Sequence, residues 1–202
     1  MIRIEGLVLA AGLSSRMGTN KMLIKVNGSV IIEKTIAVLM ESPISNITIV
    51  LGNCSNEIMK ALEYYPVNFI YNPDYESGMS SSIKCGIKWA AEQSDIEAVL
   101  VILGDMPFIK NDTISFLIEE YKKNNSAIIV PRYKGRNGHP VLFSREMFQY
   151  ILTIKGDNGA REVINNFSDQ VLFLDVDDPG ITIDLDTKQD IVNIFKDFEK
   201  EK

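Results

Sequence analysis

The chain alternates between two kinds of hydrophobic pattern. Short apolar runs rich in β-branched residues predict strands, whereas apolar residues three or four positions apart predict helices. The first predicted strand is the apolar run that begins at Leu7 and breaks at Gly12. The other predicted strands span residues 46–51, 67–71, 98–103, 127–130, 141–143, 171–174 and 181–184. The predicted helices span residues 30–40, 56–64, 112–122, 146–152 and 162–166, and a last helix follows Thr187. Another predicted helix, third in chain order, is opened by residues 76–82 and carries Ile83, Ile87, Ala90 and Ala91 on one face. Ser29, Ser55 and Asn111 are the expected N-caps of the first, second and fourth of these helices.

Up to residue 130, strands and helices alternate along the chain. This order predicts an α/β fold with a mostly parallel sheet and helices on both faces, which makes three layers. The sequence contains no internal repeat, low-complexity tract or linker, so we expect a single domain over residues 1–202. Ligands of such sheets bind beyond the carboxyl ends of the strands. The loop that begins at Gly12 and the turn that holds Asp105 both fall directly after predicted strands.

The loop after the first strand combines glycines with positive charge. Residues 12–25 contain no acid, whereas Arg16, Lys21 and Lys25 are basic. Small residues let backbone N–H groups approach an anion and cations offset its charge, so the pattern is typical of a phosphate-binding loop. Its glycine spacing fits neither Gly-x-x-x-x-Gly-Lys-Ser/Thr nor the Gly-x-Gly-x-x-Gly dinucleotide fingerprint. The alternative is an ordinary surface loop.

Carboxylates near two strand ends are candidate metal ligands. Asp105 directly follows the most apolar strand, and Mg²⁺ prefers one or two carboxylates plus phosphate oxygens. The alternative for Asp105 is an Asx turn that only stabilises the loop. Asp184 and Asp186 alternate along a predicted strand end, so both carboxylates are expected on one side. Asp184 is the candidate second ligand, and the alternative role of Asp186 is to cap the last helix.

Three further segments carry candidate chemistry. Residues 76–82 open a helix with glycine and hydroxyls, which suits either a ligand near free N–H groups or simple capping. His139, the only histidine, is either a general base or a turn residue. Arg161 precedes a helix and is either a partner for an anionic substrate or a surface arginine.

Composition and charge argue against nucleic-acid-binding, membrane-spanning and secreted classes of protein. The net charge of −6 argues against broad nucleic-acid binding, and no apolar run approaches the roughly 20 residues of a membrane span. The N-terminus lacks a signal-peptide pattern, and the two cysteines form no Cys-x-x-Cys pair. We therefore expect a reduced, cytoplasmic protein without nucleic-acid or membrane partners. Small anionic ligands suit the acid-free segment 131–145, which carries Arg132, Lys134, Arg136 and Arg145.

Several of these segments, in chain order, resemble the signature of the MobA-like nucleotidyltransferases, and the resemblance covers nearly the whole chain. It is carried by Leu9-Ala10-Ala11-Gly12, Ser15-Arg16-Met17-Gly18 and Lys21, by Gly78 and the serines after it, by Asp105-Met106-Pro107, by Gly138-His139-Pro140, by Gly156-Asp157-x-Gly159-Ala160-Arg161, and by Ile183-Asp184-Leu185-Asp186-Thr187. The resemblance implies a Rossmann-like nucleotidyltransferase fold.

The same resemblance implies roles for individual residues. The nucleotide would be held by Leu9, Ala10, Ala11, Gly12, Arg16, Lys21, Gly78, Ser80, Ser81 and Asp105. A magnesium or manganese ion would be held by Asp105 and Asp184. The acceptor would contact His139, Asp157 and Arg161, with no proton abstracted by His139.

Within that family, Ala10-Ala11-Gly12 is similar to the branch that uses CTP, whereas guanylyl-using relatives tend to have two glycines there. The implied reaction transfers CMP from CTP to the terminal phosphate of molybdenum-molybdopterin and releases pyrophosphate. Arg16, Lys21 and Asp105 would be catalytic through in-line placement and charge neutralisation. The acceptor phosphate is already ionised at neutral pH, so no general base is needed. A molybdenum hydroxylase would receive the product.

Three alternatives stay open from the sequence. The first is a related transferase that uses GTP or another phosphorylated acceptor. The second is a non-catalytic chaperone that binds the cofactor for a molybdenum hydroxylase. The third is an oxidoreductase that uses a dinucleotide, which the missing fingerprint disfavours.

Overall fold

The computed structural model describes residues 2–12, 20–156 and 159–183, together with Leu185, Ile191 and Phe195. Its centre is a mixed sheet in the order β10-β7-β9-β6-β1-β4-β5, with β8 paired to β7. The strands of this sheet are β1 (Arg3–Ala10), β4 (Asn46–Leu51), β5 (Asn68–Tyr71), β6 (Ile96–Leu103), β7 (Ile128–Tyr133), β8 (Arg136–Asn137), β9 (Val141–Ser144) and β10 (Val171–Asp175). A separate two-stranded sheet is formed by β2 (Lys25–Val26) and β3 (Ser29–Val30).

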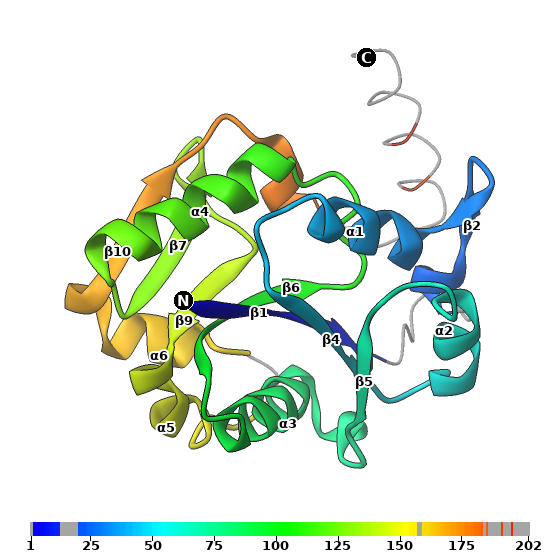
Figure 1. Cartoon of the computed structure of the whole chain (residues 1–202), viewed down its shortest axis with the longest axis horizontal. Helices are drawn as coiled ribbons and strands as arrows, with labels where there is room; N and C mark the ends of the chain where they lie inside the picture. The colour runs from blue at the N-terminus through cyan, green and yellow to red at the C-terminus, as the bar shows by residue number, and fades with distance from the viewer. Residues whose placement is uncertain are drawn as a thin grey trace.

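Helices cover both faces of the sheet (Figure 1). The α-helices are α1 (Ile31–Met40), α2 (Ser55–Ala61), α3 (Met79–Glu92), α4 (Asn111–Asn124), α5 (Phe148–Ile151) and α6 (Arg161–Asn166). Short 3₁₀ helices are η1 (Lys21–Leu23), η2 (Tyr75–Ser77), η3 (Arg145–Met147), η4 (Ser168–Gln170) and η5 (Pro179–Thr182). Among the described helices, none is both long and apolar enough to cross a membrane.

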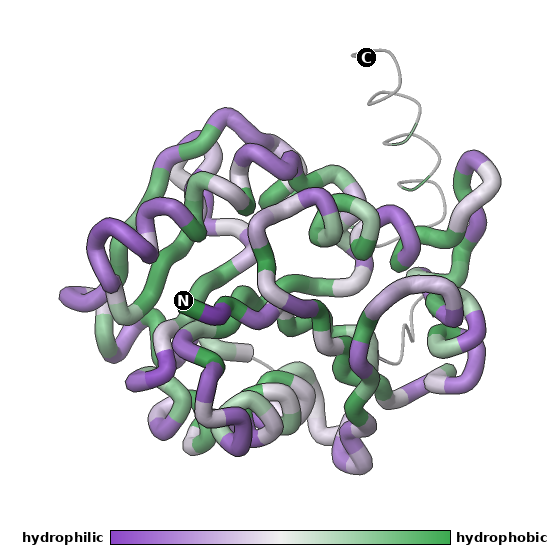
Figure 2. The backbone as a smooth tube through the Cα atoms, in the orientation of Figure 1, coloured by the Kyte–Doolittle hydropathy of each residue, from purple (hydrophilic) through white to green (hydrophobic). Residues whose placement is uncertain are grey.

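Alternation along the strands builds a separate core on each face. On β1, Ile4 and Val8 pack with apolar residues of α1, α2 and α4, whereas Leu7 and Leu9 pack with those of α3, α5 and α6. The central strands are therefore hydrophobic along much of their length, while many outer turns are hydrophilic (Figure 2). The three-layer α/β architecture predicted from the sequence is confirmed. The sheet is mostly parallel, with β9 antiparallel to both β6 and β7.

The predicted caps differ from the observed ones by one residue. Val30, the last residue of β3, is the N-cap residue of α1, and its N–H donates to the side chain of Glu33 at 2.7 Å. Cys54 precedes α2 in a left-handed conformation, and Lys110 precedes α4. Because hydroxyl and amide side chains are common on both sides of a helix start, pattern alone does not fix the first residue.

The strand predicted over residues 181–184 is wrong, since Ile181 and Thr182 lie in η5. Asp178 caps this turn by accepting the N–H of Gly180 at 2.9 Å, and Pro179 stands at its first position. Proline fixes φ near the helical value, and an aspartate cap satisfies a free N–H, so together they favour a helical turn over an extended strand.

A buried acid lies at the end of the sheet opposite the carboxyl ends of β1 and β6. Glu5 is fully buried, and its carboxylate accepts the Thr48 hydroxyl at 2.6 Å and pairs with Arg3 at 3.2 Å. Burial raises the pKa of Glu5 above its usual value, although the hydrogen bond from Thr48 and the charge of Arg3 act in the opposite direction. The ionised form is therefore disfavoured in the folded chain.

The free energy of unfolding of the wild type should fall as the pH rises above the usual glutamate pKa, because Glu5 becomes ionised. We predict that this fall is smaller in the Glu5→Gln variant. Because the folded pKa is raised, the contribution of Glu5 is complete below the unfolded pKa and is lost as the pH rises through the folded value. The free energy of unfolding of Glu5→Gln, measured by urea titration, should therefore rise relative to that of the wild type as the pH increases above the usual glutamate pKa of about 4.3. Glu119→Gln, at an exposed position of α4, is the control; parallel pH curves for wild type and Glu5→Gln would contradict the prediction.

Candidate active site at the carboxyl ends of β1 and β6

Parallel pairing brings the ends of β1 and β6 to the same edge of the sheet. Leu9 lies opposite Leu103, and the N–H of Gly104 donates to the carbonyl of Leu9 at 3.0 Å. A Cβ on Gly104 would lie 2.7 Å from the sulfur of Met22, so glycine allows this close approach. The segments that follow the two strands therefore start side by side.

Lys21 and Asp105 meet at this edge. The Lys21 Nζ forms an ion pair with Asp105 Oδ2, and the Asp105 side chain is only 10% exposed. Asn20 holds the start of η1 by accepting the N–H of Met22 at 3.1 Å, and the Met22 side chain is buried in the core. The two residues that the sequence singled out as cation and carboxylate thus come from separate loops and contact one another.

The other described residues of the first loop are partly enclosed by protein. Ala10 and Ala11 are buried, and the Ala11 carbonyl accepts the N–H of Asn53 at 3.3 Å. Neither alanine lines the large cavity described next. Gly12 is exposed, with open space where a Cβ would project, so its backbone is accessible to a ligand.

A cavity of about 690 Å³ lies beside these strand ends. Its apolar lining residues include Leu9, Leu103 and Phe143 from the sheet. Met106, next to Asp105 in the chain, also lines it, whereas Lys21 and Asp105 are not among its lining residues. Its lining also includes His139 and Arg161, both predicted site residues, and Arg136. Among the described lining residues, the charged ones are these two arginines, so the cavity suits an anion with an apolar body.

Arg136 was not singled out individually by the sequence pattern. Of the four cations in residues 131–145, Arg136 alone lines this cavity. Arg132 donates to Asp175 at 3.3 Å and lies over the ring of Phe173. Arg145 donates to three backbone carbonyls around the end of α3, at 2.7–2.8 Å. Arg132 and Arg145 therefore have structural contacts, whereas Arg136 lines the cavity.

The turn η5 joins the loop of Asp105 to the loop of His139. The buried carboxylate of Asp178 accepts the Lys110 N–H at 2.8 Å and the Thr113 hydroxyl at 2.7 Å, at the start of α4. On the other side, the carbonyl of Ile181 accepts the His139 N–H at 2.9 Å. Asp178 thus bonds directly to the end of the Asp105 loop, and Ile181 of the turn that it caps bonds to the His139 loop. The signal for Asp178 in the sequence was only an Asp-Pro-Gly turn.

The serines at the start of α3 bond within the protein. The hydroxyl of Ser80, which is buried, donates to the Gly159 carbonyl at 3.4 Å. Ser81 donates to the carbonyl of Gly78 at 2.8 Å and accepts from the Asn72 amide at 2.9 Å. The first turn of α3 presents Met79 to the large cavity, whereas Ser81 lines a second one.

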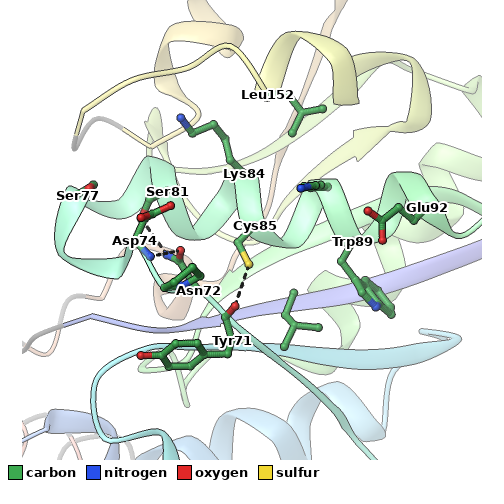
Figure 3. A pocket seen from close by; sticks show the side chains of 13 residues that line it. Tyr71, Asn72, Asp74, Ser77, Ser81, Lys84, Cys85, Trp89, Glu92 and Leu152 are labelled. Atoms are coloured by element: carbon green, nitrogen blue, oxygen red, sulfur yellow. Dashed lines mark hydrogen bonds between the residues drawn. The ribbon is translucent and has the colours of Figure 1, made fainter.

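That second cavity, of about 550 Å³, lies between α3 and β5 (Figure 3). Ser81, Lys84 and Trp89 line it from α3. Cys85 lies against the carbonyl of Tyr71 at 3.6 Å, and burial raises the pKa of its thiol, which keeps it protonated at neutral pH. The two cavities are thus on different faces of the same helix.

Comparison with known proteins identifies the family. Residues 6–176 match the family model described as the MobA-like NTP transferase domain. The chain belongs to this family. It is 28% identical over 196 residues to the molybdenum cofactor cytidylyltransferase of Escherichia coli (strain K12), and this match covers 95% of each chain. It is 26% identical over 200 residues to the nicotine blue oxidoreductase of Paenarthrobacter nicotinovorans, which covers 95% of this chain and 96% of the relative.

A solved structure of similar fold is Rv0371c from Mycobacterium tuberculosis H37Rv. It has a TM-score of 0.85 and 26% identity, and the match covers 96% of this chain and 98% of Rv0371c. A complex of Rv0371C with manganese has also been solved. The predicted nucleotidyltransferase fold is therefore confirmed at the level of the MobA-like family.

Four positions at which the family resemblance implies a ligand or a role lie outside the described residues: Arg16, Asp157, Asp184 and Asp186. Within the described part of the chain, no group of three or more His, Cys, Asp or Glu side chains gathers as a metal site. A single carboxylate at Asp105 still fits Mg²⁺ or Mn²⁺, because Mg²⁺ is commonly held by one or two carboxylates plus substrate phosphates.

We predict that Gly180→Ala disturbs the packing of η5 between the Asp105 loop and the His139 loop. A Cβ at Gly180 would lie 2.1 Å from the carbonyl oxygen of Phe108, a backbone atom that moves only with the Asp105 loop. The free energy of unfolding should fall by about 1–3 kcal/mol, as for other overpacked sites. Gly6→Ala is the control, because its Cβ would first meet the end of the Ile44 side chain at 3.3 Å. Equal urea midpoints for Gly180→Ala and wild type would contradict the close packing of η5 on the Asp105 loop.

Proposed function

We propose that this protein transfers CMP from CTP to the terminal phosphate of molybdenum-molybdopterin and releases pyrophosphate. The observation that carries the proposal is the meeting of Lys21 and Asp105 at the ends of β1 and β6, which also line a cavity whose described charged residues are arginines. Membership of the MobA-like NTP transferase family supports nucleotidyl transfer. The cytidylyl donor and the acceptor are supported by the E. coli relative at 28% identity, and less by Ala10 and Ala11, whose side chains are buried.

The residues present suit charge neutralisation better than proton transfer. In the proposed reaction an acceptor phosphate oxygen attacks the α-phosphorus, a new P–O bond forms, and the P–O bond to pyrophosphate breaks. The attacking oxygen is already ionised at neutral pH, so no base has to accept a proton. Lys21 would offset phosphate charge, and Gly12 would allow backbone N–H groups to approach it.

Asp105 is the residue that would hold a divalent ion, Mg²⁺ or Mn²⁺. When bound, such an ion would supply charge neutralisation at the phosphate oxygens. Arg136 and Arg161, which both line the cavity, would hold the anionic end of the acceptor, and the apolar lining residues would receive a ring system. His139 would contact the acceptor from a loop fixed on η5.

The direct test separates the donor nucleotide from the acceptor. The protein is incubated with Mg²⁺, molybdopterin cofactor and each of the four NTPs in turn, pyrophosphate is measured, and the product is examined by mass spectrometry. The proposal expects pyrophosphate with CTP and a cytosine dinucleotide product. Turnover with GTP alone would favour a guanylyl transferase, and cofactor binding without pyrophosphate would favour a chaperone.

An oxidoreductase is the second candidate, because one relative of nearly equal coverage is named nicotine blue oxidoreductase. The chain lacks the Gly-x-Gly-x-x-Gly fingerprint that dinucleotide-binding Rossmann enzymes carry. Oxidation of NADH or NADPH, followed by absorbance, would distinguish an oxidoreductase from a nucleotidyltransferase. Cofactor oxidation without pyrophosphate release would favour this candidate.

We predict that Asp105→Ala lowers turnover by at least about 10²-fold, the scale on which loss of one electrostatic stabiliser acts. The measurement is pyrophosphate release at saturating CTP and Mg²⁺. Asp112→Ala, in the first turn of α4 and exposed, is a control that should leave turnover unchanged. Near-normal release by Asp105→Ala would remove this carboxylate from the mechanism.

We predict that Arg136→Ala raises the KM for the acceptor at least about tenfold, because a hydrogen bond to a charged group contributes about 1.5–3 kcal/mol. The KM for the nucleotide should change little. Arg132→Ala is the matched control, since Arg132 lies in the same segment but pairs with Asp175 and does not line the cavity. Equal acceptor KM values for the two variants would contradict the assignment.

A further inference from the structure

A small hydrophobic cluster, separate from the two main cores, includes three described residues from the C-terminal part of the sequence. Its buried members are Ile31, Leu185, Ile191 and Phe195. Ile24, Val26, Phe108 and Ile183 are partly buried against it. Leu185, Ile191 and Phe195, called the C-terminal clasp below, all lie beyond the family match, which ends at residue 176.

The partners of the C-terminal clasp adjoin both Lys21 and Asp105. On one side, Ile24 directly follows η1, and its carbonyl accepts the N–H of Ile31 at 3.1 Å. On the other side, Phe108 is in the loop of Asp105, and its ring centroid lies 4.5 Å from that of Phe195. The two segments that carry the ion pair are therefore joined through one apolar cluster.

A second contact fixes Phe195 on α1. The Lys34 Nζ lies 5.8 Å from the centroid of the Phe195 ring, within the range of a cation–π interaction. The ring is only 7% exposed. Phe195 thus contacts α1 and the Asp105 loop at once.

We propose that the C-terminal clasp is a positioning element of the active site, with Phe195 as its principal residue. It acts through Phe108 and Ile24, which set the placement of Asp105 and Lys21. Its consequence for catalysis rests on the proposed function; its effect on the free protein does not. The physical reason is that misplacement of a catalytic group by about 1 Å costs as much as 10²-fold in rate.

The first test uses the free protein. The coupling between Lys21→Met and Asp105→Asn is measured by a double-mutant cycle of urea unfolding, in the wild-type and Phe195→Ala backgrounds. If the C-terminal clasp positions Lys21 and Asp105, the coupling free energy between the two substitutions should fall to about half or less in the Phe195→Ala background. A purely local packing role would lower stability and leave the coupling unchanged.

Tyr150→Ala is the matched control. Tyr150 also forms a tilted ring pair, with Phe167 at 4.4 Å between centroids, on the other face of the sheet. Its removal should leave the coupling of Lys21 with Asp105 unchanged. Phe195→Leu, which keeps an apolar side chain but loses the ring, provides a second variant should Phe195→Ala unfold, and it should weaken the coupling by a smaller amount.

The second test is kinetic. Phe195→Ala should raise the KM for the nucleotide at least about threefold relative to Tyr150→Ala, with the KM for the acceptor less affected. If the wild type turns over no nucleotide, the proposed function fails while the coupling cycle still decides the clasp. Unchanged coupling in both Phe195 variants would overturn it.

Discussion

The site depends on the parallel pairing of β1 with β6. Because Leu9 and Leu103 are opposite one another, the chain leaves both strands at the same edge, and one loop supplies Lys21 while the other supplies Asp105. The Gly104 N–H donates to the Leu9 carbonyl, which continues the contact past the strand ends. A cation and a carboxylate held this way suit a ligand that carries negative charge and a divalent ion together.

Two sets of contacts, made by residues late in the sequence, connect the loops around this pair. Asp178 and η5 connect the Asp105 loop with the loop of His139. The cluster of Phe108 and Phe195 connects the Asp105 loop with the segment after η1. Both sets of contacts come from the C-terminal quarter of the sequence, so the last segments of the chain support loops that form near its beginning and middle.

The sequence predicted most of the architecture because periodicity and strand-end position are local signals. The strand over residues 46–51 agrees with β4 at both ends. Lys21 and Asp105 were predictable as partners because the carboxyl ends of parallel strands meet at one edge. The resemblance to the family also indicated His139 and Arg161, which the large cavity brings together.

Features set by distant packing were not predictable. The strand expected at residues 181–184 fails because Asp178 caps a helical turn and Gly180 packs on the carbonyl of Phe108. Ser81 lies in a glycine- and serine-rich helix start of the kind that binds ligands. Its side chain nevertheless bonds to Asn72 and lines the second cavity, not the one beside the ends of β1 and β6. Arg136 could not be separated from Arg145 by pattern, because only tertiary contacts show which arginine lines the cavity.

The central claim is that Lys21 and Asp105 hold one triphosphate between them. A crystal of the protein with Mn²⁺ and a non-hydrolysable CTP analogue tests it most directly, because anomalous scattering locates the ion. The account predicts the ion about 2–2.2 Å from an Asp105 carboxylate oxygen, with Lys21 Nζ in contact with phosphate oxygens of the same analogue. Manganese bound away from Asp105, or an analogue whose phosphates lie out of reach of Lys21, would contradict it.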